Sequence, residues 1–336
     1  MPVTLKDVAH AAGVTHQAVS LILRGGPKAM PFATATRARV VAAAAELGYR
    51  PNRQAVSIRT GLASCIGLLL DMDWRRGAFA PPLLGNLIRA AEDRGLHVAT
   101  SIMNDETLLD PVGTSLLLSH IFASGLIIDC HSATVEPLRA RLNTARLPAV
   151  WLNNRLAADC VYPDERGNAR RLGLELLRQG ARALHLWSPG TPPEERLAHH
   201  FSYRDRWLGI EDAGAEGGVP TTLLAPSLEL GVRERRAALA AALRAMAPDS
   251  ALIAVMSPLG LEELVLGLTN ERPPTGLRLG AISLGGPMCA VIPTTLSTIP
   301  WDGMATEAVA MLLEKIAAPG EPRPPIQLSA ALTAPR

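Results

Sequence analysis

The spacing of apolar residues in the first fifty positions predicts three short helices. Apolar residues recur every three or four positions from Leu5 to Ala12, again after Thr15, and from about Thr34 to Leu47, as on one face of a helix. Gly13 ends the first helix and Thr15 can cap the second, so the turn between them is tight. Three short helices with such a turn are typical of a helix-turn-helix unit.

The same spacing assigns the buried faces of these helices. Ala18, Val19 and Ile22 fall on the inner face of the second helix. Thr4, followed three residues later by Asp7, predicts a cap at the start of the first helix. The third helix is expected to bury Val40, Val41, Ala44 and Leu47.

The helical pattern breaks after Pro51. Residues 54–60 are polar, only weakly helical, and too few to form a stable isolated helix. This segment is therefore predicted to be a linker that becomes helical when it binds a partner. We divide the chain into a helix-turn-helix domain at residues 1–50 (the head), a hinge at 51–62 and a body at 63–336.

From Cys65 onward, apolar runs of strand length alternate with amphipathic segments. The runs are Ile66–Leu70, Val98–Ile102, Leu126–Ile128, Ala149–Leu152, Leu184–Trp187, Thr222–Leu224, Leu252–Val255, Leu279–Ile282 and Leu296–Ile299. The amphipathic segments include Leu83–Arg94, Ala169–Arg178, Arg233–Met246 and Met304–Ile316. This alternation predicts an α/β body of parallel sheets covered by helices on both faces. Eight or nine strands in about 270 residues favour two doubly wound lobes, with a ligand site in the cleft between them.

Charge is distributed unevenly along the chain. The formal net charge is only +2, but residues 1–60 hold eight basic and two acidic residues, whereas the remaining 276 hold 25 basic and 29 acidic residues. A basic head on a mildly acidic body favours a polyanionic partner for the head. Chance clustering of the charges is the alternative.

Other features of the sequence argue against several protein classes. No apolar run is long enough to span a membrane and no secretory signal is recognisable, so we expect a cytoplasmic protein. The four cysteines lack metal or redox spacing and are expected to be buried free thiols. The pair His199-His200 has no third ligand and is expected in a solvated loop. Without nucleotide-binding, serine-hydrolase or zinc-protease motifs, we expect no enzyme, no catalytic residue, no metal and no cofactor.

Two segments of the head share many positions with one known family. They read VTLKDVAHAAGVTHQAVSLIL from Val3 and TRARVVAAAAELGYRPNRQA from Thr36. Looser matches follow in the body, at SGLII, PAVWLNNR, SYRDRWLGI and TLSTIPWD. The chain therefore resembles the LacI-type (lac repressor) family of bacterial transcription regulators. The resemblance implies a dimeric repressor with a periplasmic-binding-protein-like body, whose affinity for a near-palindromic double-stranded DNA operator responds to a small molecule.

The resemblance places the second helix in the major groove, with its first turn against the base edges. Gln17 can then pair with adenine, and His16 can donate to guanine or a phosphate. Thr15 and Ser20 suit phosphate oxygens, although each of these side chains could instead be a solvated surface group. The DNA-binding residues implied are Thr4, Thr15, His16, Gln17, Ser20, Leu21, Arg24, Asn52, Ala55 and Ile58.

Some of these residues depart from the family pattern. Leu21 stands where the family usually has Arg, and Arg24 stands where it usually has Asn. Leucine cannot read guanine but can touch a thymine methyl group, so we expect an operator that differs from the family norm. In the hinge, Ala55 and Ile58 match residues that wedge into the minor groove; a plain linker role is the alternative for Ile58.

The resemblance also implies effector contacts between the lobes. The candidates are Phe79, Asn153, Ser202, Arg206, Ser257 and Trp301. Arg206 can hold hydroxyls or a carboxylate in a planar fork, whereas Phe79 and Trp301 could instead be core residues. Ser283-Leu284-Gly285 replaces a usual Gly-aromatic-Asp and so removes a carboxylate that commonly accepts hydrogen bonds from sugars. Three possibilities therefore stay open: the effector is a sugar, it is a sugar-derived acid or phosphate, or the body binds no effector.

The main alternative function is that of a small-molecule binding protein without a gene-regulatory role. The body alone suits it, but the basic head and the absence of a secretory signal argue against it. After the last predicted strand, at about Gln327–Leu332, no heptad tail follows. We therefore expect a homodimer rather than a tetramer.

Overall fold

A computed structural model of the chain contains two compact units, residues 1–63 and 64–336. The structure describes residues 3–24, 31–49, 65–71, 81–103, 123–130, 132–145, 147–188, 200–226, 230–256, 258–269, 273–283 and 292–335.

The described residues of the first unit form three helices: α1 (Leu5–Ala12), α2 (His16–Arg24) and α3 (Thr34–Glu46). A capping box fixes the start of α1, because Thr4 Oγ1 accepts from the Asp7 N–H at 3.4 Å and the Asp7 carboxylate accepts from the Thr4 N–H at 2.7 Å. Gly13 ends α1 with a left-handed φ of 63°. The Thr15 hydroxyl oxygen accepts from the Ala18 N–H at 3.2 Å and caps α2. The predicted helices and caps are confirmed.

Small apolar residues pack these helices together. The buried cluster contains Val8, Ala9, Ala12, Val19, Ile22, Val40, Ala43 and Ala44. The predicted burial of Val41 and Leu47 is wrong, since these residues are 54% and 39% exposed. Successive residues of a helix point about 100° apart, so the face that buries Val40 and Ala44 turns Val41 toward solvent.

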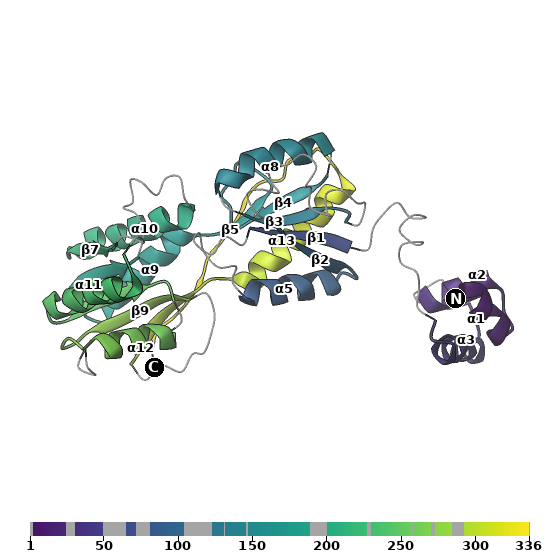
Figure 1. Ribbon diagram of the computed structural model, residues 1–336, viewed down its shortest axis with the longest axis horizontal. Coiled ribbons are helices and arrows are strands. Elements are labelled where there is room, and N and C mark those ends of the chain that lie inside the picture. Colours follow the sequence, from purple (N-terminus) through teal and green to yellow (C-terminus); the bar gives the residue numbers. More distant parts are fainter. Residues whose placement is uncertain are drawn as a thin grey trace. The chain divides into compact units, whose positions relative to one another are not determined.

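Two six-stranded sheets form the cores of two lobes in the second unit (Figure 1). The first lobe has the strand order β11-β5-β4-β3-β1-β2 and contains β1 (Cys65–Asp71), β2 (His97–Met103), β3 (Leu126–Asp129), β4 (Ala149–Leu152), β5 (Cys160–Pro163) and β11 (Ile326–Leu328). The second has the order β12-β10-β9-β8-β6-β7 and contains β6 (Ala183–Trp187), β7 (Thr221–Leu224), β8 (Ser250–Ala254), β9 (Arg278–Ser283), β10 (Thr294–Thr298) and β12 (Ala331–Thr333). The pairs are parallel except that of β12 with β10.

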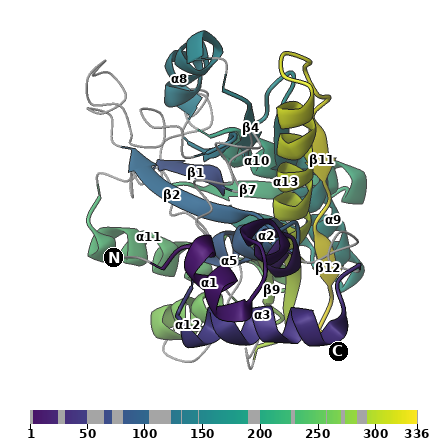
Figure 2. The same ribbon diagram turned by 90° about the vertical axis from the view of Figure 1, so that its right-hand side faces the viewer.

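Helices pack on both sheets. The first lobe has α5 (Pro81–Glu92), α8 (Ser132–Ala145) and α13 (Trp301–Ala317). The second lobe has α9 (Glu165–Arg178), α10 (Phe201–Gly217), α11 (Val232–Ala245) and α12 (Pro258–Thr269). The described strands change sheet three times, after β5, after β10 and after β11. Figure 2 shows α13 beside β11, at two of these crossovers. The predicted fold of two doubly wound lobes is confirmed.

The prediction of strands from the sequence is incomplete in two places. It does not include β5, whose sequence, Cys-Val-Tyr-Pro, ends in a proline and is not a run of aliphatic residues. The single strand expected at Gln327–Leu332 is two strands, β11 and β12, which belong to different sheets. β11 and β12 obtain their hydrogen bonds from β5 and β10, which are distant in sequence, so no local pattern separates the two strands.

The four cysteines were predicted to be buried free thiols. Cys130 and Cys160 are buried free thiols, as expected, whereas Cys65 is only half-buried and Cys289 lies outside the described residues. Burial raises the pKa of the Cys160 thiol.

Within the described ranges, no helix is long and apolar enough to cross a membrane, and no cluster of three potential ligands could hold a metal ion.

Candidate functional site

The first turn of α2 separates packing residues from polar residues. Thr15, His16 and Gln17 are exposed. The buried residues of α2 are the predicted Ala18, Val19 and Ile22. Ser20 and Leu21, one turn on, are half-buried. The residues expected to contact DNA bases therefore face solvent, while the opposite side of the helix holds it in the head.

The remaining DNA-binding candidates are described only in part. Thr4 is exposed, and its hydroxyl donates to the Asp7 carboxylate at 2.7 Å. The hydrogen bonds from Thr4 hold the pKa of Asp7 below its ordinary value. Arg24 is the last residue of α2, but its side chain is outside the described set. The hinge residues Asn52, Ala55 and Ile58 also lie outside the described residues.

In the body, two effector candidates meet where β4 ends and α10 begins. Asn153 follows β4 and has a φ of 57°. His200 caps α10, with its Nε2 2.5 Å from the Asn153 carbonyl oxygen and its Nδ1 2.8 Å from the Ser202 hydroxyl oxygen. His200 therefore links the two candidates. The expectation of a solvated loop is wrong for His200. This residue is only partly exposed, and both of its ring nitrogens lie within hydrogen-bond distance of protein oxygen atoms.

Arg206, one turn further along α10, forms a buried ion pair. Its Nε and Nη2 donate to the two carboxylate oxygens of Glu165 at 2.7 and 2.5 Å. Arg206 is 9% exposed and Glu165 is 1% exposed. The planar fork expected to hold an effector thus already holds a carboxylate of the protein, and the pair is neutral as a whole.

Close packing of α9 against α10 brings this pair together. A Cβ atom on Gly209 would lie 2.3 Å from the Arg166 carbonyl oxygen, so only glycine allows the helices to approach this closely. Asp164 caps α9, and its Oδ1 accepts from the Gly167 N–H and from Gln327 Nε2, each at 3.0 Å. Glu165 is therefore held between a helix cap and a neighbouring helix.

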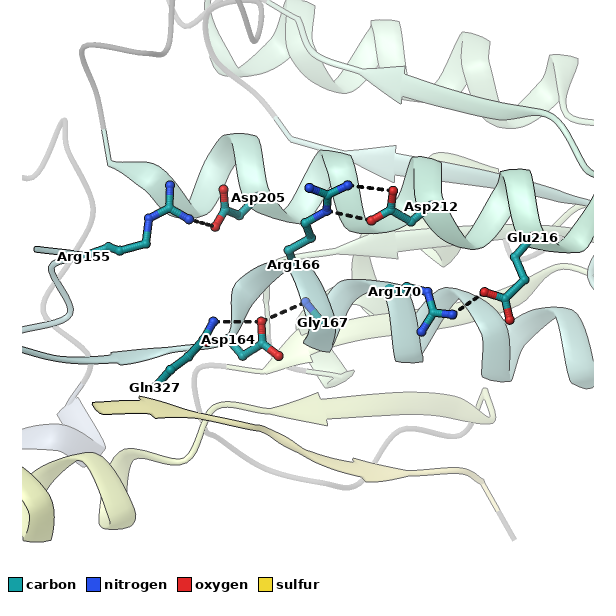
Figure 3. Close-up of polar contacts among 9 residues, drawn as sticks. All are labelled: Arg155, Asp164, Arg166, Gly167, Arg170, Asp205, Asp212, Glu216 and Gln327. Carbon is teal, nitrogen blue, oxygen red and sulfur yellow. Dashed lines mark hydrogen bonds and ion pairs between the residues drawn. The ribbon is translucent and has the colours of Figure 1, made fainter. Parts of the chain in front are cut away.

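A row of arginine–carboxylate pairs lies along α10 (Figure 3). Arg166 makes two bonds to Asp212, at 2.7 and 2.8 Å, and Arg170 pairs with Glu216. These pairs join α9 to α10 within the second lobe. The spacing of four residues between the arginines and between the acids repeats the contact on successive helical turns.

The first pair of the row joins the two lobes. Arg155, in the loop after β4, donates from Nη1 to the Asp205 carboxylate at 2.5 Å. Its guanidinium carbon lies 5.1 Å from the centre of the Phe201 ring, and Phe201 makes an edge contact with Tyr162 at 5.8 Å. Burial raises the pKa of the Asp205 carboxyl, and the positive charge of Arg155 opposes this shift.

The remaining effector candidates are Trp301, Phe79 and Ser257. Trp301 begins α13 and is 7% exposed within the main apolar cluster, which agrees with the core role given as its alternative. Phe79 and Ser257 lie outside the described residues. Ser283, at the end of β9, is buried.

A family model matches the head and supports its assignment as a helix-turn-helix domain. Residues 4–52 match the family model described as bacterial regulatory proteins, lacI family. This segment contains α1, α2 and α3 with their caps.

Residues 4–52 therefore resemble the DNA-binding segment of the lacI family.

Several curated relatives align with the chain. The maltose regulon regulatory protein MalI of Escherichia coli is 32% identical over 182 residues, which cover 53% of the chain and 51% of MalI. The regulator AglR of Rhizobium meliloti is 27% identical over 85% of the chain and 88% of its own length. The sucrose operon repressor of Klebsiella pneumoniae is 43% identical over 65% of the chain and 62% of its own length. The alignments thus span about half of MalI and under two thirds of the sucrose operon repressor.

Solved structures show the same fold. The lac repressor bound to ONPG superposes with a TM-score of 0.72 at 20% identity, covering 100% of the chain and 99% of that structure. The complex of the regulator CelR with cellobiose gives a TM-score of 0.60 at 20% identity and covers 99% of each chain. The resemblance stated from the head motifs is supported over residues 4–52, and the predicted fold is confirmed.

The sequence analysis gave no effector role to four residues around Asn153, Ser202 and Arg206: Arg155, Glu165, His200 and Asp205. One signal was available, because Ser202, Asp205, Arg206 and Gly209 share one face of a helix. Their partners come from a different lobe or a different helix, and no spacing along the chain indicates them.

Proposed function

We propose that this chain is a sequence-specific DNA-binding transcriptional regulator, a repressor that binds a near-palindromic operator as a homodimer. The head at residues 1–50 binds DNA, the hinge at 51–62 contacts the minor groove, and the body at 63–336 dimerises and binds the effector. The observation that carries the proposal is the polar first turn of α2 within the segment that matches the family model. A regulator of chromosomal DNA acts in the cytoplasm.

In this proposal, His16 and Gln17 read base edges, and Thr15 contacts the backbone. All three side chains are exposed at the start of α2, where a helix that enters the major groove presents its contacts. Leu21 is half-buried and offers an apolar surface suited to a thymine methyl group. The operator is therefore expected to differ from that of relatives with arginine at this position.

We place the effector near Asn153, Ser202 and Arg206, and we infer that it is a neutral, carbohydrate-related molecule. The buried pair of Arg206 with Glu165 is neutral overall. An anionic ligand would have to displace Glu165 or lie beside its charge, whereas hydroxyl groups can bond to either member of the pair. Relatives named for maltose and sucrose regulation, and a relative bound to cellobiose, agree with this class.

Selection of DNA from a random pool with the purified full-length protein tests the proposed function. A palindromic site should be enriched, and addition of individual neutral sugars should change its affinity. Gln17→Ala should lower affinity for the selected site by about tenfold, which is the value of one good base contact. His10→Ala, at an exposed position of α1, is the matched control. Failure to enrich any palindrome would overturn the regulator proposal.

A further inference from the structure

The first lobe contains a cavity at the amino ends of its strands. Its volume is about 510 Å³, within the range of roughly 300–1,000 Å³ typical of small-molecule sites. The cavity lies between the end of α8, the first residues of β4 and β5, and the turn that follows α13. Figure 1 shows α8 and α13 in this lobe.

This cavity is distant from the proposed effector site along the strands. Ala149 at the start of β4 lines the cavity, whereas Asn153 follows the end of the same strand. Four strand residues span roughly 10 Å, so the two places lie at opposite edges of the sheet. Because β1 is parallel to β3 and β3 to β4, Cys65 begins at the same edge as the cavity.

One part of the cavity wall is apolar. Leu142 and Trp151 belong to a buried cluster and are each 3% exposed. Leu147, Pro319 and Pro322 complete this wall. These side chains are already held in place by packing. Little side-chain entropy is therefore lost when an apolar ligand binds against them.

The charged residues that line the cavity are two cations, Arg139 and Lys315, and one carboxylate, Asp159. Lys315 Nζ lies 2.8 Å from Asp159 Oδ1, and the Lys315 side chain is 10% exposed. Asp159 is fixed in place, because its Oδ1 also accepts from the Arg323 N–H at 2.8 Å. Arg139 is 45% exposed and lies 3.5 Å from Glu136, whose side chain is 77% exposed. Asp159 offsets the charge of Lys315, and the guanidinium of Arg139 supplies a further positive charge to the cavity.

Lys315 can hold a second partner in addition to Asp159. An ammonium group has three N–H donors, and within the described part of the chain the partner of Lys315 is Asp159. A carboxylate that enters beside Arg139 could therefore accept from both cations. Charge-assisted hydrogen bonds of this kind are about twice as strong as neutral ones.

We propose that this cavity binds a small amphipathic monoanion, a carboxylate on an aromatic or branched apolar body. The carboxylate contacts Arg139 and Lys315, and the apolar body lies against Trp151 and Leu142. The site is separate from the proposed effector site and does not depend on it.

Calorimetric titration of the full-length protein tests this site, with 3-phenylpropanoate as the probe and its neutral amide as the comparison. The acid should bind at least about tenfold more tightly than the amide. Arg139→Gln should weaken binding of the acid about tenfold. Arg178→Gln should not, although Arg178 also pairs with a glutamate three residues earlier on a helix.

Two further variants test the position of the probe. Ala149→Leu should block both compounds by filling the cavity, with circular dichroism as the check on folding. Arg155→Gln removes a cation of similar exposure, 47%, from the opposite edge of the sheet, and should leave binding unchanged. The proposal is overturned if acid and amide bind equally, if neither binds up to its solubility limit, or if Arg155→Gln weakens the acid while Arg139→Gln does not.

Discussion

Removal of Glu165 should destabilise the body strongly, because it leaves a buried arginine without its partner. The Glu165 side chain is 1% exposed and that of Arg206 is 10% exposed, with two hydrogen bonds of 2.7 and 2.5 Å between them. Breaking one side of such a buried pair typically costs about 3–5 kcal/mol. We expect Glu165→Ala to lower the free energy of unfolding by this amount.

Asp212→Ala provides a matched control on the same pair of helices. Arg166 and Asp212 also form two hydrogen bonds, at 2.7 and 2.8 Å, but their side chains are 52% and 33% exposed. Water can solvate Arg166 after the carboxylate is removed, so the loss should be several-fold smaller than for Glu165→Ala. The two substitutions differ mainly in burial, which is the variable under test.

Urea unfolding followed by circular dichroism and tryptophan fluorescence measures both changes. The midpoint for Glu165→Ala should fall by more than roughly 1 M, given the slopes typical of unfolding in urea. Coincidence of the two signals checks that the body unfolds in a single transition. Equal losses for Glu165→Ala and Asp212→Ala would refute the reasoning, since burial would then not determine the cost.

Three further outcomes are expected. Burial raises the pKa of Asp205 above 3.8. The protonated carboxyl therefore stabilises the fold below pH 3.8, and this stabilisation is lost as pH rises through the raised pKa. Asp205→Asn should flatten this part of a plot of melting temperature against pH. Gly209→Ala should lower the melting temperature because its Cβ would meet the Arg166 carbonyl oxygen at 2.3 Å, whereas Gly85→Ala, with nothing within 4 Å, should raise it. If Ile58 is the minor-groove wedge, Ile58→Ala should reduce both operator affinity and DNA bending in a gel-shift assay, and unchanged bending would exclude that role.

Much of the head could be predicted from sequence alone because its structure is governed by local interactions. The Thr4–Asp7 capping box, the left-handed Gly13 and the Thr15 cap each involve residues within a few positions of one another. The error at Val41 arose because an alanine-rich helix carries a weak apolar pattern, and only packing against the other helices decides which face is inside.

The body was predicted less completely, for a physical reason. Most of its strands form continuous apolar runs, so their positions were visible in the sequence. The division of the last segment into β11 and β12 depends on neighbours from distant parts of the chain, because β11 pairs with β5 and β12 pairs with β10. The hinge residues and Phe79 stay predictions, since they lie outside the described residues.

The sequence by itself determined the resemblance of the head to the lacI family, the helix-turn-helix unit and the two-lobed α/β class, because these follow from local spacing and motif. It also identified Ser202 and Arg206 as candidates. Only the tertiary structure showed that Glu165 occupies the Arg206 fork and that Arg155 contacts Asp205 across the lobes. Ion pairs between residues 41 and 50 positions apart leave no periodic signal, and they form only when crossovers and close helix packing bring the two partners together.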